Sequence, residues 1–284
     1  MSVLFAAFLG LVQGLTEFLP VSSSGHLSIF QNFFGMEDYE SSHMMFDVML
    51  HLGTLAAVIF FYRKDIAEII KELIEMIRGL FTGREKKKEA GADGAPRPTR
   101  RLILMVIVAT LPLIVVLPLN KYIERLYYST LFVGLALILT GCILFLSDKV
   151  VNGRKSEKDA AMADALLVGV MQAVATIPGV SRSGSTITAG LLRGFERSFA
   201  VKFSFLLSIP AVLGANLLTF VDALKSGFDK ADIPACIVGV IVSAVVGYLA
   251  LGLVRLLTNK GKFGKFSYYC WAVGALTVLA TIIL

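Results

Sequence analysis

The sequence predicts an all-α membrane protein that crosses the bilayer several times. Of its 284 residues, 56% are hydrophobic, more than an ordinary soluble domain contains. Several apolar runs reach the roughly 20 residues that a helix needs to cross about 30 Å of hydrocarbon. Short polar segments separate these runs, which is typical of helices and not of the alternating strands of a membrane β-barrel. We therefore expect a single integral membrane domain over residues 1–284.

The N-terminal region predicts a re-entrant helical hairpin. Leu4–Leu19 and Leu27–Phe34 are apolar, but each run is too short to span the membrane. Pro20, three serines and Gly25 separate the two runs. A polar break at membrane depth is tolerated only where it is buried in protein or lines a cavity.

The next segments predict a full span followed by a surface helix. Met44–Tyr62 is long enough to cross the membrane and places Asp47 and His51 on one helical face. Asp65–Leu80 has apolar residues at helical spacing with charges between them, which predicts an amphipathic helix on the membrane surface. Gly83–Pro98 is basic and polar, and we expect a loop there.

Two further spans complete the first half of the chain. Leu102–Leu119 and Thr130–Leu146 are both apolar over the required length. Pro112 and Pro118 are expected to kink or end the first of them.

The second half of the chain repeats the first. Ala163–Ile177 is again a short apolar run, broken at Pro178–Thr186 and continued to Phe195. Aligning Gln172 with Gln13 also aligns Val180–Gly184 with Val21–Gly25, at a constant offset of 159 residues. The remaining spans, which bring the expected number to six transmembrane helices beside the two hairpins, are Phe199–Val221, Ile233–Val254 and Tyr268–Leu284.

This arrangement predicts an inverted-topology repeat. Repeat 1 covers about residues 1–147 and repeat 2 about residues 160–284, each with one hairpin and three spans. A hairpin returns to its own side of the membrane and three spans do not, so the second hairpin enters from the opposite face. In such folds the discontinuous helices meet near the bilayer midplane, where the binding site lies.

The basic residues predict the orientation in the membrane. Residues 63–101, 149–158, 193–197 and 255–265 carry most of the lysines and arginines and fall on one side, which is therefore cytoplasmic. Residues 63–101 thus form a cytoplasmic loop that contains the amphipathic helix, and both termini and the first hairpin face outward. The net charge of +6 follows from this topology and does not indicate nucleic-acid binding.

The two opposed breaks predict a site for an anion with several oxygens. Each second half-helix begins after a serine-rich break, so its free N–H groups and positive dipole end face the break. Arg182 adds a forked donor suited to phosphate oxygens. The phosphate-binding candidates at the two breaks are Ser22, Ser24, Gly25, Ser181, Ser183, Gly184 and Thr186.

Glu17 indicates chemistry in addition to binding. A carboxylate repels an anion, so Glu17 is expected to be a base, an acid or a ligand for a divalent cation. Gln13 lies one helical turn earlier and can supply an amide oxygen to the same metal. His26 follows Ser23 by three residues, so helical geometry would place the imidazole over the hydroxyl as a nucleophile and proton carrier.

Structural roles are open alternatives for several of these residues. The serines at the breaks can act as helix N-caps, and Glu17 and Arg182 can form a buried ion pair that holds the hairpins together. His26 can simply be packed, and Asp47 with His51 can be a structural polar pair. Small residues along Gly239–Gly252 can pack against a second chain in a homodimer or, as we favour, against a neighbouring helix.

The two breaks carry a family resemblance. Residues 13–26, with Gln13, Glu17 and the Pro-Val-Ser-Ser-Ser-Gly-His run, and residues 178–186, with Pro-Gly-Val-Ser-Arg-Ser-Gly, resemble the two signature motifs of the bacterial undecaprenyl-pyrophosphate phosphatase family linked to bacitracin resistance. The flanking spans around Phe46 and Phe203 are also similar, so the resemblance covers essentially the whole chain.

The resemblance implies an enzyme of the bacterial cytoplasmic (inner) membrane. It implies hydrolysis of the C55 prenyl pyrophosphate lipid to the monophosphate and phosphate, which recycles the carrier for peptidoglycan synthesis. It assigns Glu17, Ser23, His26 and Arg182 to catalysis or phosphate binding, with Mg²⁺ or Ca²⁺ assisting. Many relatives have Glu where this chain has Gln13, so a metal site with two carboxylates is in doubt here. The site is expected to open to the outer, periplasmic face.

A transporter is the alternative function. Inverted repeats with broken helices are a transporter architecture, so the chain could flip the prenyl monophosphate lipid, with Glu17 and His26 as a proton relay.

Overall fold

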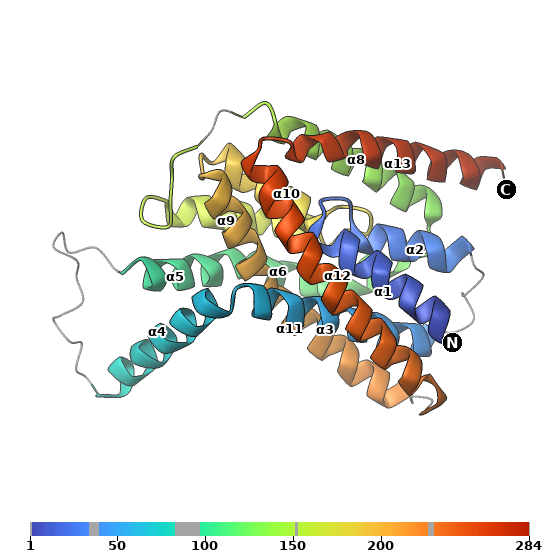
Figure 1. Ribbon diagram of the computed structural model, residues 1–284, viewed down its shortest axis with the longest axis horizontal. Coiled ribbons are helices and arrows are strands. Elements are labelled where there is room, and N and C mark those ends of the chain that lie inside the picture. Colours follow the sequence, from blue (N-terminus) through green and yellow to red (C-terminus); the bar gives the residue numbers. More distant parts are fainter. Residues whose placement is uncertain (1, 34–39, 83–96, 151–152, 227–229, 284) are drawn as a thin grey trace.

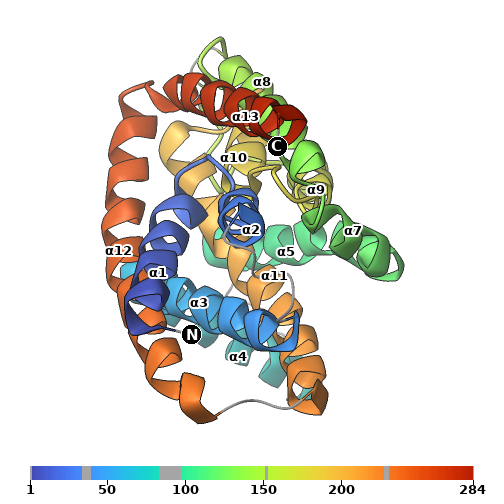
Figure 2. The ribbon, with the colours of Figure 1, turned by 90° about the vertical axis from the view of Figure 1, so that its right-hand side faces the viewer.

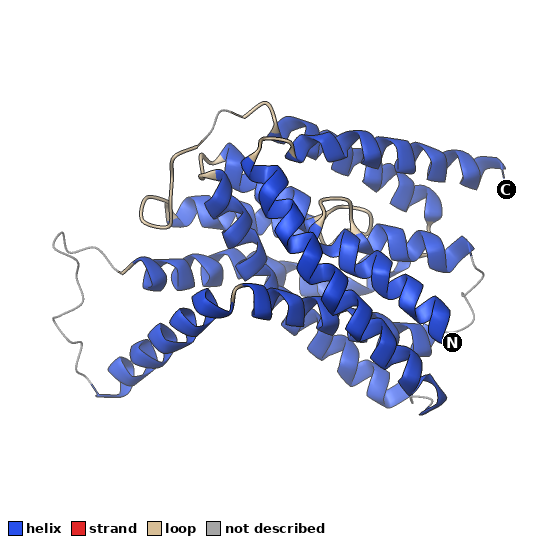
Figure 3. Ribbon diagram, in the orientation of Figure 1, coloured by secondary structure: helices blue, strands red, loops and turns tan. Residues whose placement is uncertain are grey.

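Helices make up all the regular elements in the described part of the chain. The computed structural model describes residues 2–33, 40–82, 97–150, 153–226 and 230–283 (Figure 1, Figure 3). The first half contains α1 (Val3–Phe18), α2 (Ser23–Phe33), α3 (Glu40–Phe61), α4 (Arg63–Thr82), α5 (Pro98–Thr110), α6 (Pro112–Val116), η1 (Leu117–Leu119), α7 (Asn120–Tyr127) and α8 (Thr130–Ser147). The second half contains α9 (Met162–Val174), α10 (Arg182–Leu192), α11 (Arg197–Ser226), η2 (Lys230–Asp232), α12 (Ile233–Asn259), η3 (Phe263–Lys265) and α13 (Phe266–Ile283).

The described helices confirm an all-α polytopic membrane protein. Five helical segments are long and apolar enough to cross a membrane: Pro98–Tyr127, Thr130–Ser147, Arg197–Leu217, Ile233–Asn259 and Phe263–Ile283. They correspond to five of the six predicted spans.

The remaining predicted span, Met44–Tyr62, corresponds to α3. Its apolar part, Phe46–Phe61, qualifies as a span only together with α4, from which it is bent by 85°. α4 exposes Ile70 and Ile77 on its apolar face, which fits a helix lying on a membrane surface. The predicted loop Gly83–Pro98 falls on residues 83–96, which lie outside the described residues, and on the start of α5.

Two pairs of short helices occupy the places of the predicted hairpins. α1 has 16 residues and α9 has 13, so neither reaches the length of a span. Residues 19–22 separate α1 from α2, and residues 175–181 separate α9 from α10. We call these connections, each together with the helix ends that adjoin it, the first break and the second break.

The same hydrogen bonds recur at the two breaks. The Ser22 hydroxyl oxygen accepts the Gly25 N–H at 3.2 Å, and the Ser181 hydroxyl oxygen accepts the Gly184 N–H at 3.1 Å. The Ser22 and Ser24 hydroxyls lie 3.3 Å apart, as do those of Ser181 and Ser183. Each residue lies 159 positions after its counterpart, as the sequence alignment of the halves predicts.

Helix packing follows the same repeat. Gly10 of α1 lies against Gly239 of α12, where an added Cβ would come within 2.7 Å of the Gly239 carbonyl oxygen. At the equivalent place Gly169 of α9 lies against Ala109 of α5, where the corresponding distance is 2.3 Å. Gly239 and Gly247 pack on α1 and α3 of the same chain, as favoured, whereas an added Cβ at Gly252 meets nothing within 4 Å.

α8 and α13 are the last helices of the two halves, so their contact pairs each helix with its own counterpart in the repeat. They run side by side along the upper edge in both ribbon views (Figure 1, Figure 2). Gly141 packs on Trp271 in the middle of the pair, while Gly134 meets Gly274 on one side and Leu144 meets Gly264 on the other, so the two helices are antiparallel. These contacts support the repeat, whose inverted orientation across a membrane stays a prediction.

Both chain termini lie at the same end of the molecule. Figure 1 shows N and C on its right-hand side, whereas the end of α4 and the start of α5 lie at the opposite end. The predicted topology also puts the termini together, on the side away from residues 63–101.

We predict that Gly169→Ala destabilises the protein, because a methyl group there would overlap the Ala109 carbonyl. Overpacking of this kind costs about 1–3 kcal/mol, which thermal unfolding in detergent can measure. Gly252→Ala is the matched control, since an added Cβ at Gly252 meets nothing within 4 Å. Equal stability of the two variants would show that α9 does not pack closely on α5.

Candidate active site

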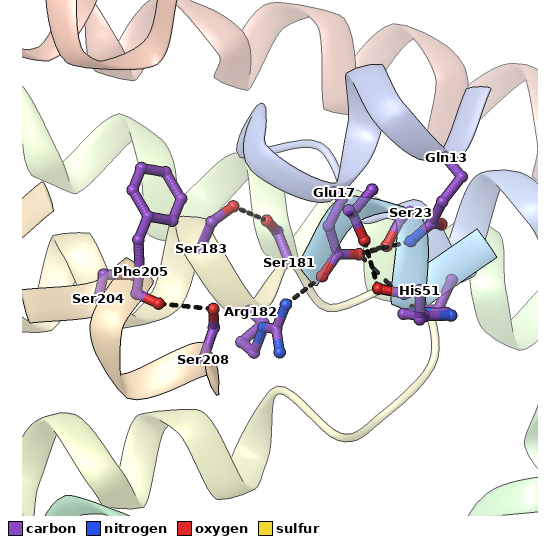
Figure 4. Close-up of polar contacts among 12 residues, drawn as sticks. Gln13, Glu17, Ser23, His51, Ser181, Arg182, Ser183, Ser204, Phe205 and Ser208 are labelled. Atoms are coloured by element: carbon purple, nitrogen blue, oxygen red, sulfur yellow. Dashed lines mark hydrogen bonds and ion pairs between the residues drawn. The ribbon is translucent and has the colours of Figure 1, made fainter. Parts of the chain in front are cut away.

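The two breaks meet at one polar cluster centred on Glu17 (Figure 4). Glu17 lies in the last turn of α1 and is 7% exposed. Arg182 is the first residue of α10, and its Nη2 donates to Glu17 Oε1. One carboxylate and one guanidinium, each supplied by a different half of the chain, therefore form a largely buried ion pair.

The second oxygen of Glu17 accepts two further hydrogen bonds. The Ser23 hydroxyl donates to Glu17 Oε2 at 2.6 Å, and Gln13 Nε2 donates to the same oxygen at 3.1 Å. These donors favour the ionised form of Glu17, and in that form its Oε2 is a hydrogen-bond acceptor for the Ser23 hydroxyl. This is the geometry of a hydroxyl nucleophile and its general base.

His51 approaches the same carboxylate from α3. Its Nδ1 donates to the main-chain oxygen of Asp47 at 2.7 Å, which leaves Nε2 facing Glu17 Oε2 at 3.9 Å. The Asp47 carboxylate accepts a hydrogen bond from Gln31 Nε2 at 3.1 Å. Asp47 and His51, whose pairing was left open, thus meet through the Asp47 main-chain oxygen, and the imidazole is turned toward Glu17.

His26 lies away from Ser23, contrary to expectation. Its Nδ1 donates to the Ser22 carbonyl at 2.7 Å, so Nε2 accepts the Tyr269 hydroxyl at 2.8 Å. Ser22, whose carbonyl bonds the edge of the His26 ring, has a left-handed backbone with φ of +70°. The predicted pairing of His26 with Ser23 is therefore not formed, and Glu17 takes the place that we assigned to the imidazole.

The predicted phosphate-binding residues divide by exposure. Ser22, Gly25, Ser181, Ser183, Gly184 and Thr186 are buried. Ser22 and Ser181 cap their helices, and Thr186 pairs with Ser204 at 2.6 Å. Ser23, Ser24 and Arg182 are the partly exposed members. The buried residues shape the two breaks, and the three exposed ones can touch a ligand directly.

Sequence reasoning missed three residues of the site. Tyr269 of α13 holds His26, Thr140 of α8 holds the second break, and Tyr127 of α7 holds α2. The Ser28 hydroxyl donates to the Tyr127 carbonyl at 2.5 Å, and Ser24 is hydrogen-bonded to the Tyr127 side chain. All three residues come from distant segments, so no local motif marks them.

Gln13 offers an oxygen that fits a cation. Its Oε1 is buried and has no hydrogen-bond partner among the described residues. The described part of the chain contains no group of three His, Cys, Asp or Glu side chains that could hold a metal. Glu17 and Gln13 can thus supply two oxygens, which suits Mg²⁺ because this ion usually takes its other ligands from water and substrate phosphates.

Comparison with known proteins decides the family. The family model of the bacitracin resistance protein BacA matches residues 6–276. The chain belongs to the BacA family. It is 41% identical over 284 residues to the undecaprenyl-diphosphatase of Alkaliphilus metalliredigens (strain QYMF), with 100% of both chains covered. It is 38% identical to that of Halothermothrix orenii over 98% of both chains, and 38% identical to that of Methanosphaera stadtmanae over 100% of both chains.

We predict that Arg182→Met destabilises the protein by leaving the Glu17 carboxylate buried without its cation. The cost should fall at the lower end of the roughly 3–5 kcal/mol typical of a broken buried pair, because Arg182 keeps 23% of its side chain exposed. Adding Glu17→Gln to Arg182→Met should restore most of the loss in thermal unfolding in detergent. A double variant that is no more stable than Arg182→Met would rule out the pair as the cause.

Proposed function

We propose that this protein hydrolyses undecaprenyl pyrophosphate to undecaprenyl phosphate and inorganic phosphate. Family membership supports this activity, and so do the relatives named undecaprenyl-diphosphatase. One observation carries the proposal: the Ser23 hydroxyl donates a hydrogen bond to the Glu17 carboxylate, and Arg182 of the other half donates to the same carboxylate. A nucleophile, a base and a phosphate-binding cation thus meet at the two breaks.

Substrate binding would open the Glu17–Arg182 pair. The pyrophosphate lies between the breaks, with its prenyl chain left in the lipid beside the helices. Arg182 turns from Glu17 to the terminal phosphate, which its forked donors can bind by two parallel hydrogen bonds. The positive ends of α2 and α10 favour the same charge.

Ser23 and Glu17 would carry the reaction. The Ser23 oxygen attacks the terminal phosphorus, or holds the water that does so, while its proton passes to Glu17. The new P–O bond forms as the bridging P–O bond breaks, and undecaprenyl phosphate leaves. After direct attack by Ser23, a water molecule attacks the phosphorus of the phosphoserine. The bond between this phosphorus and the Ser23 oxygen breaks as Glu17 returns its proton to that oxygen, and inorganic phosphate leaves. Arg182 and the N–H groups at the helix starts stabilise the charge on the transferred phosphoryl group.

His26 would position the first break. It holds the carbonyl of Ser22, the residue before Ser23, and is itself fixed by Tyr269. We therefore assign proton transfer at Ser23 to Glu17 and orientation of the Ser23 backbone to His26.

A divalent cation, Mg²⁺ or Ca²⁺, would be held by Glu17 and Gln13. When bound it would neutralise charge on the pyrophosphate oxygens. Gln13 keeps an unpartnered oxygen for it, which is the structural support for this assignment.

The reaction would take place in the bacterial cytoplasmic membrane at a site open to its outer face. The product is the lipid carrier of peptidoglycan synthesis, so the enzyme recycles this carrier. Removal of the pyrophosphate lipid also gives bacitracin resistance.

We predict that Ser23→Ala, Glu17→Ala and Arg182→Ala each lower phosphate release from a short-chain prenyl pyrophosphate in detergent. The loss in kcat should be at least about 100-fold, as for other removed nucleophiles, bases and charge stabilisers. Near wild-type turnover by both Glu17→Ala and Arg182→Ala would reject the proposal.

Thr16→Val is the matched control for these variants. Thr16 neighbours Glu17, but its hydroxyl donates to the Val12 carbonyl of its own helix at 2.6 Å. It should therefore keep kcat within about twofold of wild type.

A further inference from the structure

The second break is held by a hydroxyl from a distant helix. Thr140 of α8 is 1% exposed, and its Oγ1 donates to the Gly179 carbonyl at 2.9 Å. The same oxygen accepts the Ser181 N–H at 3.0 Å. One side chain therefore satisfies two main-chain groups that a broken helix would otherwise leave unpaired in an apolar surrounding.

This contact differs from those of two other buried threonines, Thr258 and Thr277. Thr258 and Thr277 donate to carbonyls one turn earlier in their own helices, at 2.8 and 2.9 Å. Thr140 instead reaches across to another element. The hydrogen bonds of Thr140 thus serve the second break and not α8.

The surface of α8 fits the second break closely. Gly179 has a left-handed φ of +89°, and a Cβ there would lie 2.7 Å from both the Ala136 Cβ and the Val133 carbonyl oxygen. Val133, Ala136 and Thr140 lie at helical spacing and so share one face of α8. The break therefore rests on α8 with Thr140 as its polar contact.

Thr140 is linked to the reaction through a short covalent path. Ser181, whose N–H it accepts, is the N-cap of α10, and Arg182 is the next residue. Movement of the Ser181 backbone would move the guanidinium that meets Glu17. A misplacement of about 1 Å at a reacting group can cost about 100-fold in rate.

The first break has a weaker hold at the equivalent place. The Cys270 thiol of α13 donates to the Pro20 carbonyl at 3.8 Å, where Pro20 is the counterpart of Gly179. A thiol is a poor donor and this contact satisfies only one main-chain group. Thr140 thus holds the second break more firmly than Cys270 holds the first, where His26 and Tyr269 hold Ser22 instead.

We propose that Thr140 is a positioning residue for hydrolysis, acting through the Ser181 backbone on Arg182. The inference rests on the proposed function for its kinetic consequence. It assigns a role in the reaction to a residue of α8, a helix that carries none of the groups proposed to touch the substrate.

The test compares Thr140→Val, which removes the hydroxyl at nearly constant volume, with Thr140→Ser, which keeps it. Thr140→Val should lower kcat/KM for a short-chain prenyl pyrophosphate by roughly 10-fold, and Thr140→Ser should recover at least half of the wild-type value. Thr277→Val is the matched control, because Thr277 is buried between α8 and α13 but bonds only its own helix. Equal losses in all three variants, or none in Thr140→Val, would overturn the proposal.

A double-mutant cycle shows whether Thr140 acts through Arg182. In an Arg182→Lys background, Thr140→Val should lower kcat/KM by less than about twofold, because the group it positions has already been changed. A full 10-fold loss in that background would contradict the proposal.

Amide hydrogen exchange tests the contact without activity. The Ser181 amide should exchange at least about 10-fold faster in Thr140→Val than in wild type, and at an unchanged rate in Thr277→Val. If the wild-type protein releases no phosphate, the proposed function is wrong. The exchange measurement would still show whether the Thr140 hydroxyl holds the Ser181 N–H. If Thr140→Val does not fold, Thr140→Cys replaces it, because the thiol keeps only a weak donor. Unchanged Ser181 exchange would overturn the proposal.

Discussion

The ion pair between Glu17 and Arg182 joins the last turn of α1 to the first residue of α10. A buried charge is costly unless it is paired, and each of these residues is the main charged partner of the other. The pair needs both breaks at the same place, so the packing of α1 on α12, of α9 on α5 and of α8 on α13 all serve this meeting. In the proposed mechanism, a phosphate group of the ligand replaces the Glu17 carboxylate as the partner of the Arg182 guanidinium.

The repeat explains how one site can contain two different chemistries. Ser23 and Arg182 are equivalent positions in the two halves, as are Glu17 and Thr176. The caps at Ser22 and Ser181 keep the same geometry in both halves, whereas these equivalent positions have diverged. In the proposed reaction, the first half supplies the hydroxyl and its base, and the second half supplies the cation. A symmetric scaffold would therefore carry an asymmetric reaction.

Much of the fold could be predicted because length and periodicity are local properties. The apolar runs before Pro20 and Pro178 are too short to span, and the constant offset between the halves predicted that their breaks would be equivalent. The repeat predicted that the two breaks would meet, and the Glu17–Arg182 ion pair found there was one of the alternatives left open. The contact of His26 with Ser23 was predicted wrongly, because the two ring nitrogens of His26 bond the Ser22 carbonyl and the Tyr269 hydroxyl, and Tyr269 belongs to a distant helix that a spacing rule does not contain. Tyr269 and Thr140 reach the breaks through packing of distant helices, so no spacing rule could find them.

The central claim is that one phosphate is held by both breaks at once. A structure determined with a short-chain prenyl methylene-diphosphonate, in which a CH₂ group replaces the bridging oxygen, would test this claim most directly. The account predicts the terminal phosphonate within hydrogen-bonding distance of both the Ser23 hydroxyl and the Arg182 guanidinium, with Arg182 turned away from Glu17. A diphosphonate bound to residues of one break alone, with the Glu17–Arg182 pair intact, would contradict it.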